Sequence, residues 1–227
     1  MPTVMITGAS RGLGLEFARQ YAADGWRVIA TCRAPARADA LNAIGGVDVH
    51  ALDVDDFDAV AELAEALSGT AIDVLINNAG IYGPKGYSLN EMDFSVWGEV
   101  MRTNAMAPLR VSQCFAPHVA ASALKCIATL SSKMGSMADN TSGGSYIYRS
   151  SKAAVNAVMK SLAHDLAGQG IGVLILHPGW VRTDMGGSAG LIDADFSVAG
   201  MRQVIAARGD LSHSGGFFNY DGAEIPW

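Results

Sequence analysis

The chain has 227 residues, of which 50% are hydrophobic and 17% charged, and its formal net charge is −6 at pH 7. This length and apolar content suit one domain with a substantial core, so we expect residues 1–227 to form a single domain. The acidic balance and the lack of any Lys/Arg run argue against nucleic acid or an anionic membrane as the principal partner, and they favour a small-molecule ligand.

The N-terminus and the cysteines together predict a cytoplasmic protein. The chain reaches a glycine-rich turn within its first eight residues, without the basic segment and long apolar core of a signal peptide. No apolar run approaches the roughly 18 residues that a membrane span requires. The three cysteines, Cys32, Cys114 and Cys126, are odd in number and lack metal-like spacing. We therefore expect buried thiols in a reducing compartment, with no disulfide frame and no metal site.

Short apolar runs alternate with helical patterns along the chain. The runs lie at residues 4–7, 27–31, 47–52, 74–77, 125–130, 172–177 and 216–220. The helical patterns lie at residues 13–23, 57–67, 94–116, 148–167 and 198–207. This alternation is typical of repeated βαβ units around a buried parallel sheet. The sequence therefore predicts an α/β fold: a single doubly wound Rossmann-type domain with a seven-stranded, mainly parallel sheet and helices on both faces.

The first apolar run leads into a glycine-rich turn, Thr7-Gly8-Ala9-Ser10-Arg11-Gly12-Leu13-Gly14. Glycines between a strand and a helix allow a tight turn and close approach of the backbone to a pyrophosphate, whose charge the helix N-terminus favours. The spacing Gly-x3-Gly-x-Gly departs from the common Gly-x-Gly-x2-Gly fingerprint. A dinucleotide site is the interpretation that the strand–turn–helix context favours, and a loop that merely turns the chain is the alternative.

The end of the second run carries the signal for the type of nucleotide. An NAD site usually has an Asp or Glu here to hold the ribose 2′-hydroxyl, whereas this chain has Cys32 followed by Arg33. Arg33 and Arg11 of the glycine turn offer two guanidinium groups, which suit a 2′-phosphate and favour NADP(H). A solvated surface charge is the alternative for each arginine. After the third run, Asp53 could accept a hydrogen bond from an adenine amine or cap the next helix.

Polar residues follow the fourth and fifth runs. The segment Asn77-Asn78-Ala79-Gly80 combines amides with small residues at a carboxyl strand end, the edge where open α/β sheets bind ligands. Asn104 lies in a helical pattern although asparagine is a mediocre helix former, and a surface position is its alternative. Ser131-Ser132 closes the fifth run, where a turn or cap role is the alternative.

Proline and glycine break the chain after the sixth run, at His177-Pro178-Gly179. The segment from there to about residue 195 is rich in glycine and small residues, which is typical of a mobile lid. We interpret His177 as structural because no serine or cysteine nucleophile motif accompanies it. The terminal Trp227 is expected to pack against the core.

Tyr148 and Lys152 lie four residues apart in the longest helical pattern. At this spacing both side chains share one helix face, so the ammonium can favour the ionised phenol and lower its pKa. The reference pKa of a phenol is about 10, and a nearby cation moves it toward the range in which proton transfer to a substrate oxygen is efficient. Taken alone, the pair is also what a solvated helix face produces by chance.

These motifs together resemble the short-chain dehydrogenase/reductase family. The resemblance rests on Thr7-Gly8-x3-Gly12-x-Gly14, Asn77-Asn78-Ala79-Gly80, Asn104, Ser132, Tyr148-x3-Lys152 and Pro178-Gly179, which occur in order over nearly the whole chain. Within the family, residues 135–140, 177–185 and 220–227 look like the C-factor and Sniffer-type carbonyl reductase group.

The resemblance implies four catalytic residues. Tyr148 would be the general acid toward a carbonyl oxygen, and Lys152 would lower its pKa and hold the nicotinamide ribose. Ser132 would hydrogen-bond the same oxygen, and Asn104 would order a water that leads protons to Lys152. The family usually places its serine closer to the tyrosine than Ser132 lies, so the loop between them carries an apparent insertion. Ser136 is therefore a rival for the serine role.

The resemblance also implies a cofactor site. Its residues are Gly8, Ser10, Arg11, Gly12, Leu13, Gly14, Arg33, Asp53, Val54, Asn78, Ala79, Gly80, Asn104, Tyr148, Lys152, Pro178, Gly179, Val181 and Thr183. The sequence thus predicts an NADPH-dependent carbonyl reductase that transfers hydride between the nicotinamide and an aldehyde, ketone or alcohol. The alternative is a cofactor-binding signalling or developmental protein of the C-factor type with little or no turnover. Family members are often homodimers or homotetramers, and both states stay open.

Overall fold

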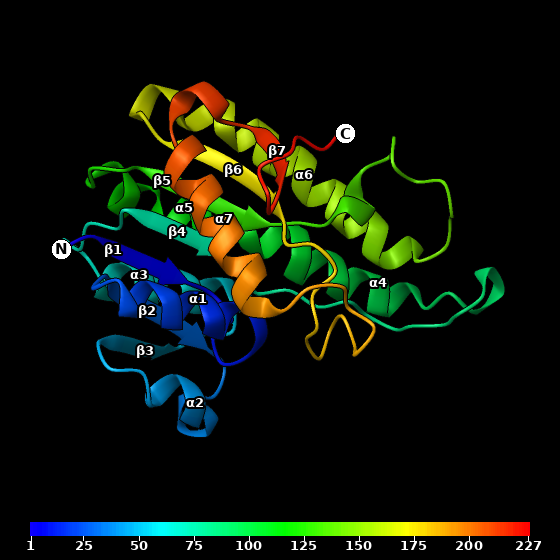
Figure 1. Ribbon diagram of the computed structural model, residues 1–227, viewed down its shortest axis with the longest axis horizontal. Coiled ribbons are helices and arrows are strands. Elements are labelled where there is room, and N and C mark those ends of the chain that lie inside the picture. The colour runs from blue at the N-terminus through cyan, green and yellow to red at the C-terminus, as the bar shows by residue number, and fades with distance from the viewer.

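The computed structural model describes residues 1–227 and contains one seven-stranded sheet (Figure 1). The strands are β1 (Thr3–Ile6), β2 (Arg27–Cys32), β3 (Val47–Ala51), β4 (Val74–Asn77), β5 (Cys126–Leu130), β6 (Gly172–His177) and β7 (Gly216–Asn219). Their order in the sheet is β3-β2-β1-β4-β5-β6-β7, and every pair is parallel. The predicted fold class is confirmed, and each of the seven predicted runs overlaps one strand.

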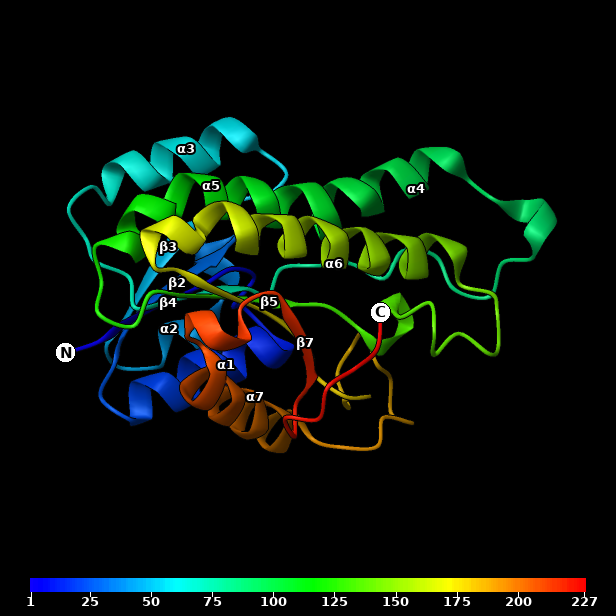
Figure 2. The same cartoon turned by 90° about the horizontal axis from the view of Figure 1, so that it is seen from above.

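Helices cover both faces of the sheet (Figure 2). They are α1 (Gly12–Ala23), α2 (Asp39–Asn42), α3 (Phe57–Ala66), α4 (Phe94–Met101), α5 (Ala107–Ala120), α6 (Tyr146–Leu166) and α7 (Ala194–Arg208). On one side lie α3, α4, α5 and α6, and on the other lie α1, α2 and α7. None of the helices combines the length and the hydropathy that a membrane span needs.

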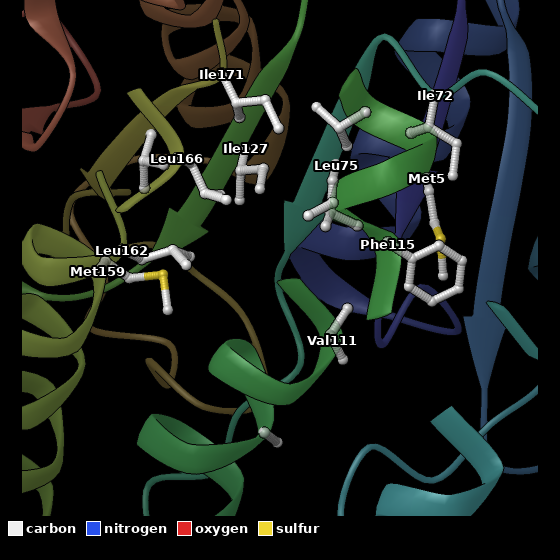
Figure 3. Packing of buried hydrophobic residues seen from close by; sticks show 14 of the residues in the cluster. Met5, Ile72, Leu75, Val111, Phe115, Ile127, Met159, Leu162, Leu166 and Ile171 are labelled. Carbon is white, nitrogen blue, oxygen red and sulfur yellow. The ribbon is translucent and has the colours of Figure 1, made fainter. Parts of the chain in front are cut away.

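Alternation along the strands divides the core between the two faces. In β1, Met5 belongs to a cluster with side chains of α3, α5 and α6, whereas Val4 and Ile6 belong to a second cluster with α1 and α7. Figure 3 shows part of the first cluster, including Met5, Phe115 of α5 and Leu162 of α6. A strand that is apolar on both faces must be covered on both, which is why the sequence shows continuous apolar runs rather than alternation.

Two helical predictions are corrected. The pattern at residues 94–116 is not one α-helix, because the π-helical turn Arg102–Met106 separates α4 from α5. The last helix begins at Ala194, four residues before the predicted start, so the segment after β6 ends close to the predicted residue 195. The short helix α2 was not predicted, because its four residues carry no readable periodicity.

The predictions for the cysteines and the terminal tryptophan hold in part. All three cysteines are free, and Cys32 and Cys126 are buried while Cys114 is half-buried. The ring of Trp227 stacks on Phe217 with centroids 5.6 Å apart, but 43% of the residue is exposed. Trp227 therefore packs on the core with one face only.

The strand order changes direction between β1 and β4, and the carboxyl ends of strands at such a switch point are where open α/β sheets bind ligands. The glycine turn follows β1, and Asn78 to Gly80 follow β4. Ser132 follows β5, and Pro178 follows β6. The fold therefore gathers residues from four strand ends at one edge of the sheet.

Candidate active site

The glycine turn is held against the end of β4 by two polar side chains. The Thr7 hydroxyl accepts hydrogen bonds from the backbone N–H groups of Asn78 and Ala79, both at 3.1 Å. The Asn78 amide donates to the carbonyls of Thr7 at 2.8 Å and Gly8 at 3.0 Å. Asn78 thus positions the turn through its side chain.

Glycine is required at two positions of this turn for different reasons. Gly8 has a φ of +68°, and a Cβ there would lie 2.9 Å from Ala79 Cα. A Cβ on Gly14 would lie 2.4 Å from the Gly8 carbonyl oxygen and 2.5 Å from Asn78 Nδ2. The turn therefore brings bare backbone to the N-terminus of α1, the arrangement that suits a pyrophosphate.

Replacing Gly14 by alanine is expected to lower the free energy of unfolding by about 1–3 kcal/mol, because the new methyl group cannot fit without moving the turn. Gly98 in α4 is the matched control, since a Cβ at that position would meet no atom within 4 Å. There the helix propensity of alanine should add up to about 1 kcal/mol. Urea unfolding of both variants measures the difference, and equal effects would contradict the role given to Gly14.

The proposed nucleotide pocket has two exposed arginines at its rim. The turn is joined to β2 by a hydrogen bond from Ala9 N to Thr31 O at 2.9 Å, which brings the end of β2 next to it. Arg33 is exposed there and forms none of the ion pairs of the structure. Arg11 pairs with Asp184 at 3.3 Å, with both side chains more than 70% exposed. Because both side chains are exposed, the ion pair contributes little to stability, and a phosphate can compete with Asp184 for Arg11.

The neighbours of these arginines require two corrections. Cys32 is only 4% exposed and packs in the core, so its side chain does not face a ribose. Asp53 does not cap α3, because Asp56 does so by accepting from Ala59 N at 3.0 Å. The Asp53 carboxylate accepts instead from Asp55 N and is exposed, while Val54 is buried. The exposed carboxylate keeps a free oxygen for an adenine amine.

Asn104 lies inside the π-helical turn and is 1% exposed, so its predicted surface alternative is wrong. Its Oδ1 accepts from Ile81 N at 2.9 Å, and its Nδ2 donates to Ile81 O at 2.8 Å and to Ser151 Oγ at 3.0 Å. Both amide hydrogens are used, but Oδ1 keeps a second lone pair for a water. A π-helical turn inside an α-helix is a frequent mark of a functional position.

Lys152 and Tyr148 project from α6 toward this edge of the sheet. Lys152 is 6% exposed, and its Nζ donates to Leu130 O at 2.9 Å and lies 5.8 Å from the Tyr148 ring centroid. Burial lowers the pKa of Lys152 to about 8. Gly80 is adjacent, since a Cβ there would lie 3.7 Å from Nζ and 3.2 Å from Asn104 Oδ1.

The Tyr148 phenol is 8% exposed, and burial raises its pKa to about 12. Interaction with the Ser132 hydroxyl lowers this pKa, and the neighbouring Tyr82 raises it. The lowering expected from Lys152 does not contribute to this shift, because the ammonium is itself buried and donates to Leu130 O, and desolvation controls the pKa of the phenol. At neutral pH the phenol is protonated and can donate.

The two candidate serines have different surroundings. Ser132 begins the 3-10 turn Lys133–Gly135, accepts from Met134 N at 3.2 Å and interacts with the Tyr148 phenol. Ser136 is 1% exposed, and its hydroxyl accepts from Asp139 N at 3.1 Å. Only Ser132 thus approaches Tyr148, whereas Ser136 stabilises its own loop.

The segment after β6 folds back over the glycine turn. A Cβ on Gly12 would lie 3.8 Å from a methyl carbon of Thr183. Val181 is 4% exposed and pairs with Ile192 in an isolated bridge, and Gly179 has a φ of +83° with Ile192 and Tyr220 against it. Pro178 O accepts from Ser197 Oγ of α7. Of the residues predicted from 178 to 183, Thr183 therefore lies beside the turn, whereas Pro178, Gly179 and Val181 pack against Ser197, Tyr220 and Ile192.

His177 is half-buried, and burial lowers its pKa to about 4. It is neutral at pH 7, and no hydrogen bond to its Nδ1 is present. These observations agree with a structural histidine.

One residue beside Tyr148 was not predicted. The ring of Tyr82 stacks on that of Tyr148, with centroids 4.3 Å apart and planes at 20°. Tyr82 lies in the loop after Gly80, where the sequence has neither a strand end nor a helical pattern. The one sequence feature that could have indicated Tyr82 is that this aromatic residue lies two positions after the predicted ligand-binding segment Asn77–Gly80.

The site as a whole fits a nicotinamide dinucleotide. Bare glycine backbone lies at the N-terminus of α1, exposed Arg11 lies in the same turn, and exposed Arg33 lies at the end of β2. The buried Lys152 lies beside Gly80, and the buried Tyr148 lies one helical turn before it. No cluster of three or more His, Cys, Asp or Glu side chains could hold a metal ion.

Comparison with known proteins gives a family match over most of the chain. The model of the short chain dehydrogenase family matches residues 2–191. The C-signal of Myxococcus xanthus is 45% identical over 156 residues, which are 69% of this chain and 93% of that protein.

Solved structures match over the full chain. Carbonyl reductase Sniffer of D. melanogaster is 33% identical with a TM-score of 0.90, and the comparison covers 100% of both chains. NADPH-bound carbonyl reductase from chicken fatty liver is 34% identical with a TM-score of 0.90, over 100% of this chain and 99% of that one. Both resemble this chain in sequence as well as in fold.

Proposed function

Because this chain belongs to the short-chain dehydrogenase family, we propose that it is an NADPH-dependent carbonyl reductase that converts an aldehyde or ketone to an alcohol. The observation that carries the proposal is the buried Tyr148 phenol, protonated at neutral pH and in reach of the Ser132 hydroxyl. A protonated phenol beside a second hydroxyl donor is what a carbonyl oxygen needs when it gains negative charge.

NADPH, when bound, would supply hydride to the carbonyl carbon. Tyr148 gives its proton to the substrate oxygen as charge develops there, and Ser132 donates a hydrogen bond to the same oxygen. Both donors are fixed and desolvated, so their effect on the developing charge is larger than in water. Lys152 would hold the nicotinamide ribose, and Asn104 Oδ1 has a lone pair for a water that would return a proton toward Lys152.

The rest of the cofactor would lie along the strand ends. The glycine turn and the N-terminus of α1, with Ser10, Leu13 and Thr183, would hold the pyrophosphate. Arg11 and Arg33 would hold the 2′-phosphate. Asp53 and Val54 would contact the adenine. The segments Asn78–Gly80 and Pro178–Val181 would contact the nicotinamide end.

A second candidate function is cofactor-dependent signalling with little turnover, favoured by the similarity to a protein named C-signal. The test is NADPH oxidation at 340 nm with a panel of aldehydes and ketones, alongside direct measurement of NADPH binding. Turnover with any carbonyl supports the reductase. Tight binding without turnover over the whole panel supports the signalling candidate.

The parent protein is expected to prefer NADPH over NADH by about ten- to a hundredfold in kcat/KM, because a hydrogen bond to a charged group contributes roughly 1.5–3 kcal/mol. Arg33→Ala should lose most of that preference, and the preference of the parent should fall as ionic strength rises. Arg37→Ala, at another exposed arginine near the end of β2, is the matched control.

A parent that uses both cofactors equally, or an Arg33→Ala variant with unaltered selectivity, would contradict this placement of the 2′-phosphate. Cys32→Asp, the change that the sequence suggests first, is the poorer test. Cys32 is buried, so a carboxylate there would destabilise the fold before it could repel a phosphate.

A further inference from the structure

The helix that carries Tyr148 and Lys152 lacks a cap of its own. The residue before α6, Ser145, has a left-handed backbone with φ +46° and ψ +38°, and its side chain makes no capping hydrogen bond. Gly143 and Gly144 before it each have a φ of +65°. The first N–H groups of a helix have no partner within it, so groups outside the helix or water must satisfy them.

The loop between β4 and α4 supplies these contacts with two tyrosines. The Tyr87 hydroxyl accepts from Ile147 N at 3.1 Å, and the Tyr82 hydroxyl lies 3.2 Å from Ser145 Oγ. The loop also packs closely, since a Cβ on Gly83 would lie 2.9 Å from Val100 Cγ2 and 3.6 Å from Ile147 Cγ2. The start of α6 is therefore fixed from outside the helix.

Tyr82 also connects the phenol of Tyr148 to the segment after β6. One face of Tyr82 stacks on Tyr148, at 4.3 Å between ring centroids. Lys85 Nζ lies 5.1 Å from the Tyr82 ring centroid and donates to Met185 O at 2.8 Å. Tyr82 thus stands where the loop after β4, the start of α6 and the segment after β6 meet.

We propose that Tyr82 is a positioning residue for Tyr148: its stacked ring and its hydrogen bond to Ser145 hold the phenol in the orientation that proton transfer requires. This inference rests on the proposed reductase function for its kinetic consequence. A stacked neighbour covers one face of the Tyr148 ring, so the substrate oxygen approaches the hydroxyl edge, where Ser132 interacts with the phenol. Placement matters because a displacement of about 1 Å can cost on the order of a hundredfold in rate.

Tyr82→Leu is expected to lower kcat by about ten- to a hundredfold without changing the affinity for NADPH, because the stacked ring is lost while the cofactor contacts remain. Tyr82→Phe keeps the ring and should retain most of the activity. Tyr146→Leu is the matched control: Tyr146 lies at the same end of α6 and is 43% exposed, and the ring that stacks on Tyr148 is that of Tyr82.

The pH profile separates positioning from general destabilisation. The titratable groups that face Tyr148 are Tyr82 and Lys152, with the Ser132 hydroxyl beside them. Burial and Tyr82 both raise the pKa of Tyr148, so removing the ring admits water and lowers that pKa. Reduction needs the protonated phenol, and its loss at alkaline pH should therefore begin at lower pH in Tyr82→Leu than in the parent.

An NMR titration, which needs no catalytic turnover, tests the role of Tyr82 separately from the proposed reductase function. Protein labelled with 13C at tyrosine Cζ gives one resonance per tyrosine, and Tyr148→Phe identifies that of Tyr148. Its titration is expected to move to lower pH in Tyr82→Leu and to stay in place in Tyr146→Leu. A parent without turnover that shows this movement would refute the reductase and support the placement. An active parent whose Tyr82→Leu variant keeps its kcat, pH profile and Tyr148 titration would refute the inference about Tyr82.

Discussion

Tyr148→Phe is expected to lower kcat by at least about 100-fold while the affinity for NADPH stays nearly unchanged, because only the acidic hydroxyl is removed. Phenylalanine keeps the ring that stacks on Tyr82 and fits the same buried volume, so folding should be preserved. The measurement is single-turnover reduction of the best carbonyl substrate, with NADPH binding followed by fluorescence.

Tyr146→Phe is the natural control, because the two tyrosines lie two residues apart at the start of α6. Tyr146 is 43% exposed, whereas Tyr148 is 8% exposed and faces Ser132. Removing the Tyr146 hydroxyl should change kcat little. Equal losses from the two substitutions would rule out Tyr148 as the specific proton donor.

Ser132→Ala is expected to cost about 2–4 kcal/mol of transition-state stabilisation, the scale of one donor to a developing oxyanion. Ser132 interacts with the Tyr148 phenol, so both donors can address one substrate oxygen. Steady-state kinetics should show the loss in kcat rather than in KM, because the hydrogen bond strengthens as charge develops.

Ser136→Ala is the control for Ser132→Ala. Ser136 holds Asp139 N within its own loop, so its loss should cost about 1 kcal/mol of stability and leave kcat largely intact. A larger kinetic effect at Ser136 than at Ser132 would transfer the role to Ser136.

The sheet could be predicted closely because its signal is local and strong. The strands are short, and most of them are apolar on both faces, as in β4, which ends at Asn77 with Asn78 after it. The edge strand β3 alternates apolar and polar residues instead. The π-helical turn at Arg102–Met106 could not be predicted, because the apolar periodicity continues through it and only tertiary contacts fix the extra residue. The early start of α7 at Ala194 was missed because its first turn carries exposed residues such as Phe196.

The candidate site was predictable where residue type and strand end coincide. The glycine turn, Asn78, Ser132 and the pair Tyr148 and Lys152 all follow or face carboxyl strand ends. The sequence could not show how far burial removes water from the side chains of Tyr148 and Lys152. The lysine was expected to lower the phenol pKa, but both groups are buried, and the loss of hydration controls the outcome.

The same limit applies to residues whose role depends on a distant partner. Cys32 reads as the residue facing the ribose, although its side chain packs into the core. Tyr82 reads as an ordinary loop residue, although it stacks on Tyr148 from 66 positions away in the chain. Such contacts arise when a loop packs on a helix, and they produce no periodic pattern in the sequence.

The π-helical turn also changes the angular phase of the long helical segment that contains it. One inserted residue rotates all following side chains by about 100° around the axis. Before the turn, α4 contacts α6 near the loop that holds Tyr82, and after it α5 contacts β4 and α3. The helices before and after the turn therefore present differently oriented faces, α4 to α6 and α5 to the sheet. A substitution in α4 beside Gly83 can thus change the loop that holds Tyr82 without altering the packing of α5 on the sheet.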